Sequence, residues 1–201
     1  MKLLANITIE LNTNASTDTV ISIKKYVPGA THVYGVKNPV LNDIAAKYKS
    51  GGFELILELW NSGSYEEKII AAKLIRKVCI KNPIKALELV EQFSKDIDNW
   101  ALCDTLDMQS LKPVNKKISK EIFAVATKFS VSDNMWQKRL SLVLVENFCK
   151  QKVFHPAIKK LIALQKSGNE HYIRKAVEWL ERNLNKQLLK FNFLICQKSI
   201  S

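Results

Sequence analysis

Residues 97–100 read Ile97-Asp98-Asn99-Trp100, and a similar stretch, Ser132-Asp133-Asn134-Met135-Trp136, follows further along the chain. Spacings of 40, 36 and 43 residues separate the four tryptophans, Trp60, Trp100, Trp136 and Trp179. Such spacings are typical of HEAT and armadillo units, in which each repeat is a pair of helices. The sequence therefore predicts an all-α protein, an α-α superhelix (solenoid) of HEAT-like helical repeats. Stacked pairs of this kind curve, and they leave an extended concave face.

Signals for helix starts support this fold class from about residue 15 onward. Asn38-Pro39 and Asn82-Pro83 each place a capping residue before proline, and Ser64 precedes Glu67 in a capping-box pattern. Only residues 7–11 hint at a strand. We expect one domain, 1–201, with an atypical short N-terminal segment 1–14 and a shortened C-terminal tail from about residue 187. Further helices are predicted at 53–60, 83–94, 99–109, 115–129, 132–150, 155–167 and 169–190.

Basic residues are in excess, and they are unevenly distributed. The chain has 31 Lys and Arg against 19 Asp and Glu, a net charge of +12. Residues 1–100 hold 13 basic and 11 acidic side chains, whereas residues 101–201 hold 18 and 8. A basic half indicates a polyanionic partner, with nucleic acid favoured over a membrane surface. No apolar run reaches the length of a membrane span, and we expect no signal peptide because the N-terminal apolar run is short and broken by Asn6.

The four cysteines are scattered and show no CxxC pairing. Without such pairing a zinc site is not expected. A disulfide framework is not expected either, because a chain of this size builds its own core. We predict reduced, mostly buried thiols in a cytoplasmic protein. The sequence also lacks a glycine-rich phosphate loop and an HExxH motif.

Trp100 and Asp104 lie four residues apart in DNWALCD, which puts them on the same side of a helix. An indole face attracts cations, and a carboxylate one turn away stabilises positive charge. Together they suit a flat, cationic ligand. The alternative is that Trp100 is a core residue and Asp104 a solvated or capping acid.

Two further clusters lie in the basic half. Lys138 and Arg139 occupy the first turns of a helix expected to begin at Ser132 or Asp133. Basic residues there suit a docked phosphate, although ordinary surface charge is an equal alternative. Lys175 and Trp179 are one turn apart in HYIRKAVEWLERNL. Taken alone, a tryptophan at such a position more often belongs to the core.

Together, these segments resemble a known family. The chain is similar over residues 26–186 to the bacterial HEAT-like-repeat DNA glycosylases that remove alkylated purines, the AlkD type of DNA alkylation repair enzyme. The order and separation of the segments agree with that family. The matching segments are YGVKNPVLNDIAAKY (34–48), ELWNSGSYEEKIIAAKLIRK (58–77), DNWALCD (98–104), SDNMWQKRLSLVL (132–144) and HYIRKAVEWLERNL (171–184).

The resemblance implies a role for each matching residue. Asp104 takes the place of the catalytic carboxylate, and Trp100 and Trp179 take the places of the tryptophans at the lesion. Arg139 corresponds to a phosphate-binding arginine and Tyr26 to a tyrosine near the lesion. The resemblance implies that the protein holds duplex DNA containing alkylated purines in its concave face and cleaves the N-glycosidic bond without base flipping, metal or cofactor. A monomer is expected, as for any solenoid that clamps a duplex. Lys138 and Lys175 join the expected DNA-binding set on the basis of charge.

Some positions depart from the family pattern. Ala101 stands where the family has an acid, and Asn147 stands where some relatives have a basic residue. The tail QLLKFNFLICQKSIS also differs from the family C-terminus. Two alternatives therefore remain beside the glycosylase: a HEAT-like-repeat protein that binds DNA without excising bases, and a protein-interaction scaffold.

Overall fold

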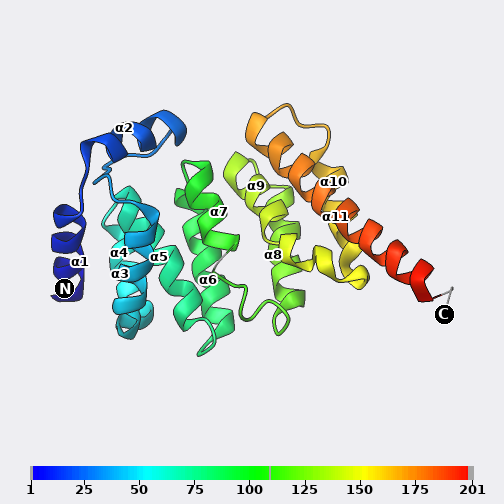
Figure 1. Cartoon of the computed structure of the whole chain (residues 1–201), viewed down its shortest axis with the longest axis horizontal. Coiled ribbons are helices and arrows are strands. Elements are labelled where there is room, and N and C mark those ends of the chain that lie inside the picture. The colour runs from blue at the N-terminus through cyan, green and yellow to red at the C-terminus, as the bar shows by residue number, and fades with distance from the viewer. Residues whose placement is uncertain (1, 109, 199–201) are drawn as a thin grey trace. The chain divides into compact units, whose positions relative to one another are not determined.

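The computed structural model describes the backbone of residues 2–108 and 110–198, and the side chains of 2–106 and 110–187. Within these ranges the chain forms eleven α-helices and four short 3₁₀-helices, and no strand (Figure 1). Successive helices pack against each other, as α4 does on α5 and α10 on α11. The predicted all-α, helical-repeat class is confirmed. The concave basic face stays a prediction.

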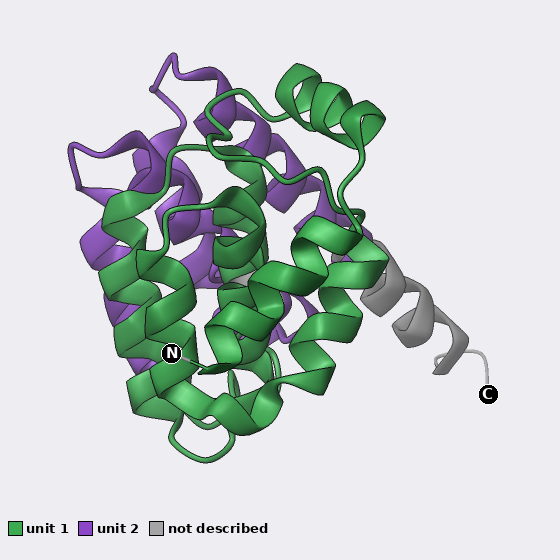
Figure 2. Ribbon diagram, turned by 90° about the vertical axis from the view of Figure 1, so that its left-hand side faces the viewer, with its two compact units in different colours: residues 1–119 green, residues 120–201 purple. Residues whose placement is uncertain are grey.

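The chain divides into two compact units, residues 1–119 and 120–201 (Figure 2). Each unit has its own helices and buried side chains, and each is described by itself below. The prediction of one continuous domain from 1 to 201 stays a prediction.

In unit 1, helix α5 is the central element, packed against α3, α4 and α7. Its apolar residues at helical spacing, such as Ile70 and Leu74, are fully buried. The α-helices of this unit are α1 (Lys2–Thr13), α2 (Thr17–Tyr26), α3 (Asn38–Lys47), α4 (Gly52–Asn61), α5 (Tyr65–Val78), α6 (Pro83–Phe93) and α7 (Trp100–Met108). Two 3₁₀-helices, η1 (Lys49–Gly51) and η2 (Ser94–Asp96), follow α3 and α6.

The strand hinted at by residues 7–11 is wrong, because this stretch lies within α1. Ile7 and Leu11 are one turn apart and fully buried, and α1 packs on α4. The Glu10 carboxylate accepts hydrogen bonds from Lys47 Nζ at 2.5 Å and Tyr48 Oη at 2.6 Å. Tertiary contacts with α3 and α4 thus stabilise a helix that its asparagine- and threonine-rich sequence favours only weakly.

Two of the three predicted helix caps are confirmed. Ser64 accepts a hydrogen bond from the backbone N–H of Glu67 at 3.2 Å, and Asn82 accepts one from Lys85 at 3.0 Å. The expectation for Asn38 is wrong by one residue, since Lys37 is the N-cap of α3 and makes no side-chain cap bond. Proline in the first turn sets the start of this helix instead.

Unit 2 contains α8 (Ser119–Ser130), α9 (Met135–Val143), α10 (His155–Gln165) and α11 (His171–Lys198). The single helix predicted at 132–150 is wrong: α9 ends at Val143 and the chain continues as the 3₁₀-helices η3 (Glu146–Lys150) and η4 (Lys152–Phe154). The cap of α9 is Asn134, whose side chain accepts from the N–H groups of Trp136 and Gln137, rather than Ser132 or Asp133.

Cys79, Cys103 and Cys149 are buried, which confirms that part of the prediction, and none of these three is in a disulfide. Cys196 lies outside the residues whose side chains the structure describes. Burial raises the pKa of the Cys149 thiol to about 12, so this group stays protonated at neutral pH. No helix in the described ranges is both long enough and apolar enough to cross a bilayer.

Candidate functional site

One side of the candidate site is formed by α2 and the segment that connects it to α3. The backbone N–H of Ser16, the N-cap of α2, donates to the carbonyl oxygen of Gly35 at 3.1 Å. Gly35 has a φ of 86°, and a β-carbon there would overlap the carbonyl oxygen of Ser16. Only glycine combines this left-handed backbone with so close an approach.

A buried carboxylate fixes this connecting segment. The side chain of Glu66 on α5 is 0% exposed and accepts hydrogen bonds from three consecutive backbone N–H groups. The donors are Tyr34 at 3.0 Å, Gly35 at 2.7 Å and Val36 at 3.1 Å. Hydrogen bonds to a carboxylate are stronger than those between neutral groups. Through residues 34–36, Glu66 therefore fixes the start of α3 and the N-terminal end of α2 relative to α5.

The C-terminal end of α2 is tied to α7. Helix α2 ends at Tyr26 before Pro28 and Gly29, and a β-carbon on Gly29 would overlap the carbonyl oxygen of Asp98. The indole Nε1–H of Trp100 donates to the carbonyl oxygen of Tyr26 at 3.0 Å. This hydrogen bond fixes the orientation of the Trp100 ring, and its acceptor is a backbone atom. The side chain of Tyr26 is 62% exposed.

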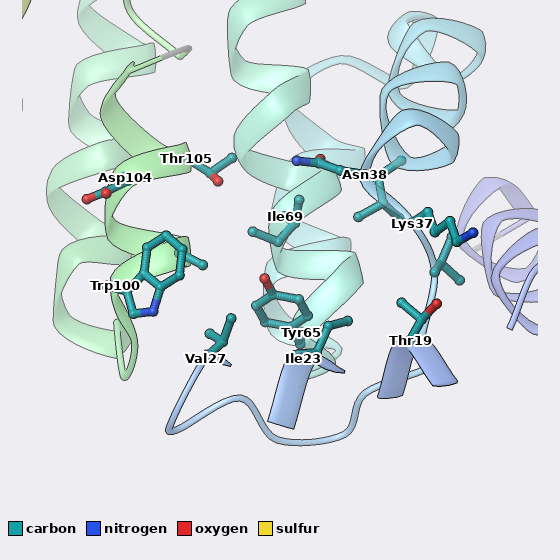
Figure 3. Close-up of a pocket in the computed structure, with 13 residues that line it drawn as sticks. Thr19, Ile23, Val27, Lys37, Asn38, Tyr65, Ile69, Trp100, Asp104 and Thr105 are labelled. Carbon is teal, nitrogen blue, oxygen red and sulfur yellow. The ribbon is translucent and has the colours of Figure 1, made fainter. Parts of the chain in front are cut away.

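Trp100 and Asp104 line one cavity of about 300 Å³ (Figure 3). Both side chains are half-buried and come from successive turns of α7. Figure 3 shows them on one side of the cavity, with Thr19 and Lys37 on the other. The remaining lining residues come from α2, α3, α5 and α7 or lie close to their ends: Ile23, Val27, Val36, Asn38, Leu41, Tyr65, Ile69, Ala101 and Thr105.

Sequence reasoning missed Tyr65 as part of this wall. Burial, together with the neighbouring Glu66 carboxylate, raises the pKa of Tyr65 to about 12, so the phenol is neutral at physiological pH. Tyr65 and Ile69 lie one turn apart on α5, and this spacing was a signal for a shared face. The cavity therefore combines aromatic and aliphatic walls with the Asp104 carboxylate, an environment suited to a flat cation.

The predicted residues of unit 2 lie on α9 and α11, two helices that pack against each other. Arg139 is only 8% exposed, and its Nη1 donates to the carbonyl oxygen of Tyr172 at 2.6 Å. The Trp136 ring packs against the Tyr172 ring with centroids 5.0 Å apart. Arg139 thus links two helices in this structure, and its predicted contact with a phosphate stays a prediction.

Lys138, Lys175 and Trp179 also belong to unit 2. Lys138 is half-buried on α9, while α11 carries the exposed Lys175 and, one turn later, the half-buried Trp179. Since Trp179 and the Trp100–Asp104 pair belong to different units, their predicted joint action on one lesion stays a prediction.

The comparison with known proteins identifies the family. A family model described as DNA alkylation repair enzyme matches residues 7–192. The chain belongs to the DNA alkylation repair enzyme family. The match covers all seven predicted site residues and confirms the resemblance drawn from the sequence. No curated protein matches this chain.

Membership of the DNA alkylation repair enzyme family makes DNA the partner and alkylation repair the function. Ala101, the position that departs from the family pattern beside the candidate carboxylate, lines the cavity and is half-buried. Within the described part of this alkylation repair enzyme, no group of three His, Cys, Asp or Glu side chains could hold a metal ion.

Proposed function

We propose that this protein is an alkylpurine DNA glycosylase that hydrolyses the N-glycosidic bond of cationic N3- or N7-alkylpurines in duplex DNA. The damaged base stays stacked in the duplex, so the reaction proceeds without base flipping. The proposed enzyme is a cytoplasmic monomer that uses no metal or organic cofactor.

The observation that carries this proposal is the pairing of Trp100 with Asp104 on α7 beside one cavity. Both side chains are half-buried, and the indole is held by its hydrogen bond to the Tyr26 carbonyl oxygen. A scaffold that binds proteins has no need of an oriented indole face next to a carboxylate. A cationic nucleoside requires both groups, one for the flat ring system and one for the charge.

The chemistry follows from the charge of the substrate. Alkylation at N3 or N7 gives the purine a positive charge, which weakens its bond to C1′ of the deoxyribose. When that bond breaks, its electron pair stays with the purine, and positive charge moves onto the sugar. Asp104 stabilises this oxocarbenium-like sugar and positions the water that adds to C1′, with loss of a proton. The products are the neutral alkylated base and an abasic site.

The other candidate residues have supporting roles in this proposal. Trp179 contributes a second aromatic face at the lesion, and Tyr26 lies near it. Arg139, Lys138 and Lys175 neutralise backbone phosphates, which accords with the basic excess in residues 101–201. These assignments depend on the resemblance and on charge, and mutagenesis of each side chain tests them separately.

The direct test is release of 7-methylguanine from a methylated duplex, compared between the wild-type protein and Asp104→Asn. We expect the substitution to abolish release and to leave duplex binding nearly intact, because the amide keeps the shape but not the charge. Glu88→Gln, which removes an exposed carboxylate on α6, is the matched control and should release the base at the wild-type rate.

Two results would count against this proposal. Equal rates for wild-type protein and Asp104→Asn would remove Asp104 from the mechanism. Duplex binding by the wild-type protein without any base release would favour the alternative, a family member that binds DNA and no longer excises bases.

A further inference from the structure

A second cavity, of about 200 Å³, lies between α3 and α5 and is lined by positive charge. Its lining residues are Asn42 and Ala45 from α3 and Lys73, Arg76 and Lys77 from α5. Three of the five are cations and none is a carboxylate. A small cavity with this lining suits an oxyanion.

Lys73 is the unusual member of this cluster, because its side chain is only 4% exposed. Its Nζ donates one hydrogen bond, to Asn42 Oδ1 at 2.7 Å. An ammonium group has three N–H donors, and the amide oxygen of Asn42 is neutral. No carboxylate among the described residues forms an ion pair with Lys73.

Burial of an unneutralised charge is costly, and here it lowers the pKa of Lys73. Arg76 and Lys77 add two exposed cations to the lining of the same cavity. The described residues provide no acid within ion-pair distance of either side chain. Like charges gathered in this way repel one another, and a bound anion would relieve both this repulsion and the burial cost.

The cationic cavity lies one helical turn along α5 from the cavity of Trp100. Tyr65 and Ile69 line the first cavity, and Lys73 and Arg76 continue the same face of the helix. On α3, Leu41 lines the first cavity and Ala45 the second. Ile69 and Lys73 are about 6 Å apart along the helix axis, so the two cavities are close neighbours on α5.

We propose that Lys73, Arg76 and Asn42 form a phosphate-binding site that holds one backbone phosphate of the DNA next to the cavity of Trp100 and Asp104. Lys73 and Arg76 donate to the non-bridging oxygens, while Asn42 Oδ1 orients the Lys73 ammonium group. The site deepens the proposed function and rests on it for the source of the phosphate, which is the DNA backbone.

The test is binding of an unmodified duplex, measured by fluorescence anisotropy over a range of salt concentrations. Lys73→Met keeps the length and volume of the side chain, and Arg76→Gln changes only an exposed residue, so a folding defect in one variant does not affect the other. Each variant should bind about fivefold more weakly at physiological salt, and the slope of log affinity against log salt should fall by about one. Lys81→Gln, an exposed cation outside the cavity, is the matched control.

A second arm distinguishes the DNA backbone from free phosphate. Thermal unfolding is measured in inorganic phosphate and in chloride at equal ionic strength. If Lys73→Met loses a stabilisation by inorganic phosphate but binds the duplex as wild type does, the site takes a free anion and the DNA assignment is overturned. Duplex affinities and salt slopes equal to those of Lys81→Gln also overturn it. Neither duplex binding nor thermal unfolding depends on base release. Both measurements can therefore be interpreted even if the glycosylase proposal fails.

Discussion

The indole Nε1 of Trp100 and the carbonyl oxygen of Tyr26 are 3.0 Å apart, and the hydrogen bond between them joins α7 to the end of α2. Since the acceptor is a backbone atom, the identity of residue 26 has little effect on the bond. The donor, in contrast, is supplied only by the indole.

Replacing Trp100 with Phe should therefore loosen the end of α2 while retaining an aromatic face. A net hydrogen bond contributes about 0.5–1.5 kcal/mol, so the amide hydrogens of residues 26, 27, 29 and 30 should exchange up to about tenfold faster. Tyr26→Phe is the control, because it keeps the backbone acceptor and should exchange at the wild-type rate. Hydrogen–deuterium exchange measures both variants. Equal acceleration in the two would show that the tyrosine side chain, rather than the indole N–H, holds this segment.

Glu66→Gln should destabilise unit 1 because the three backbone donors of residues 34–36 lose a charged acceptor. The amide also places an N–H group opposite one of those donors. We expect the free energy of unfolding to fall by about 2–3 kcal/mol, the scale of a buried hydrogen bond to a charged group. Urea denaturation measures the change, and the exposed Glu88→Gln should stay within about 0.5 kcal/mol of wild type. A similar small effect for Glu66→Gln would show that the segment is held by other contacts.

Glu10 should make the stability of the protein depend on pH. Hydrogen bonds from Lys47 and Tyr48 hold the pKa of the Glu10 carboxyl below its usual value of 4.5. Because the pKa of Glu10 is lower in the folded state, its ionised carboxylate stabilises the protein above the unfolded-state pKa. This contribution is lost as the pH falls through the folded-state pKa. Glu10→Gln should thus melt at a lower temperature than wild type at neutral pH, and the difference should vanish once the pH has fallen below the folded-state pKa of Glu10. A difference that persists in acid would assign the effect to packing of α1.

DNA binding should weaken steeply with salt if the basic residues neutralise phosphates. About four phosphate contacts would reduce affinity about a hundredfold between roughly 50 and 200 mM salt. Anisotropy titrations with an unmodified duplex give the slope directly. Affinity that stays flat over this range would exclude a basic DNA-binding surface of the proposed kind.

The helical class, the confirmed caps and the α7 pair of Trp100 and Asp104 followed from local patterns. Helix α1 did not, because its stability comes from burial of Ile7 and Leu11 against other helices rather than from propensity. The break after Val143 was missed for a related reason. The apolar run of residues 140–145 continues the helical pattern, and the backbone nevertheless changes to a 3₁₀ turn.

Parts of the candidate site could not be predicted because they depend on contacts distant in sequence. Tyr65 joins the wall of the first cavity only through the packing of α5 on α7. The burial of Lys73 depends likewise on α3, which supplies the amide of Asn42. Arg139 illustrates the reverse case: its sequence position suggests a surface cation, and the fold turns it inward to the backbone of Tyr172.

Helix α2 contributes no buried residue of its own, yet it forms one wall of the cavity beside Trp100. The attachment of this helix at each end uses a main-chain acceptor, the carbonyl oxygens of Gly35 and Tyr26. Thr19 and Ile23 can therefore be replaced by smaller or larger side chains without emptying the interior. Under the proposed function, substitutions at these two positions would change the size of adduct that the cavity admits while the thermal stability of the protein stays almost constant.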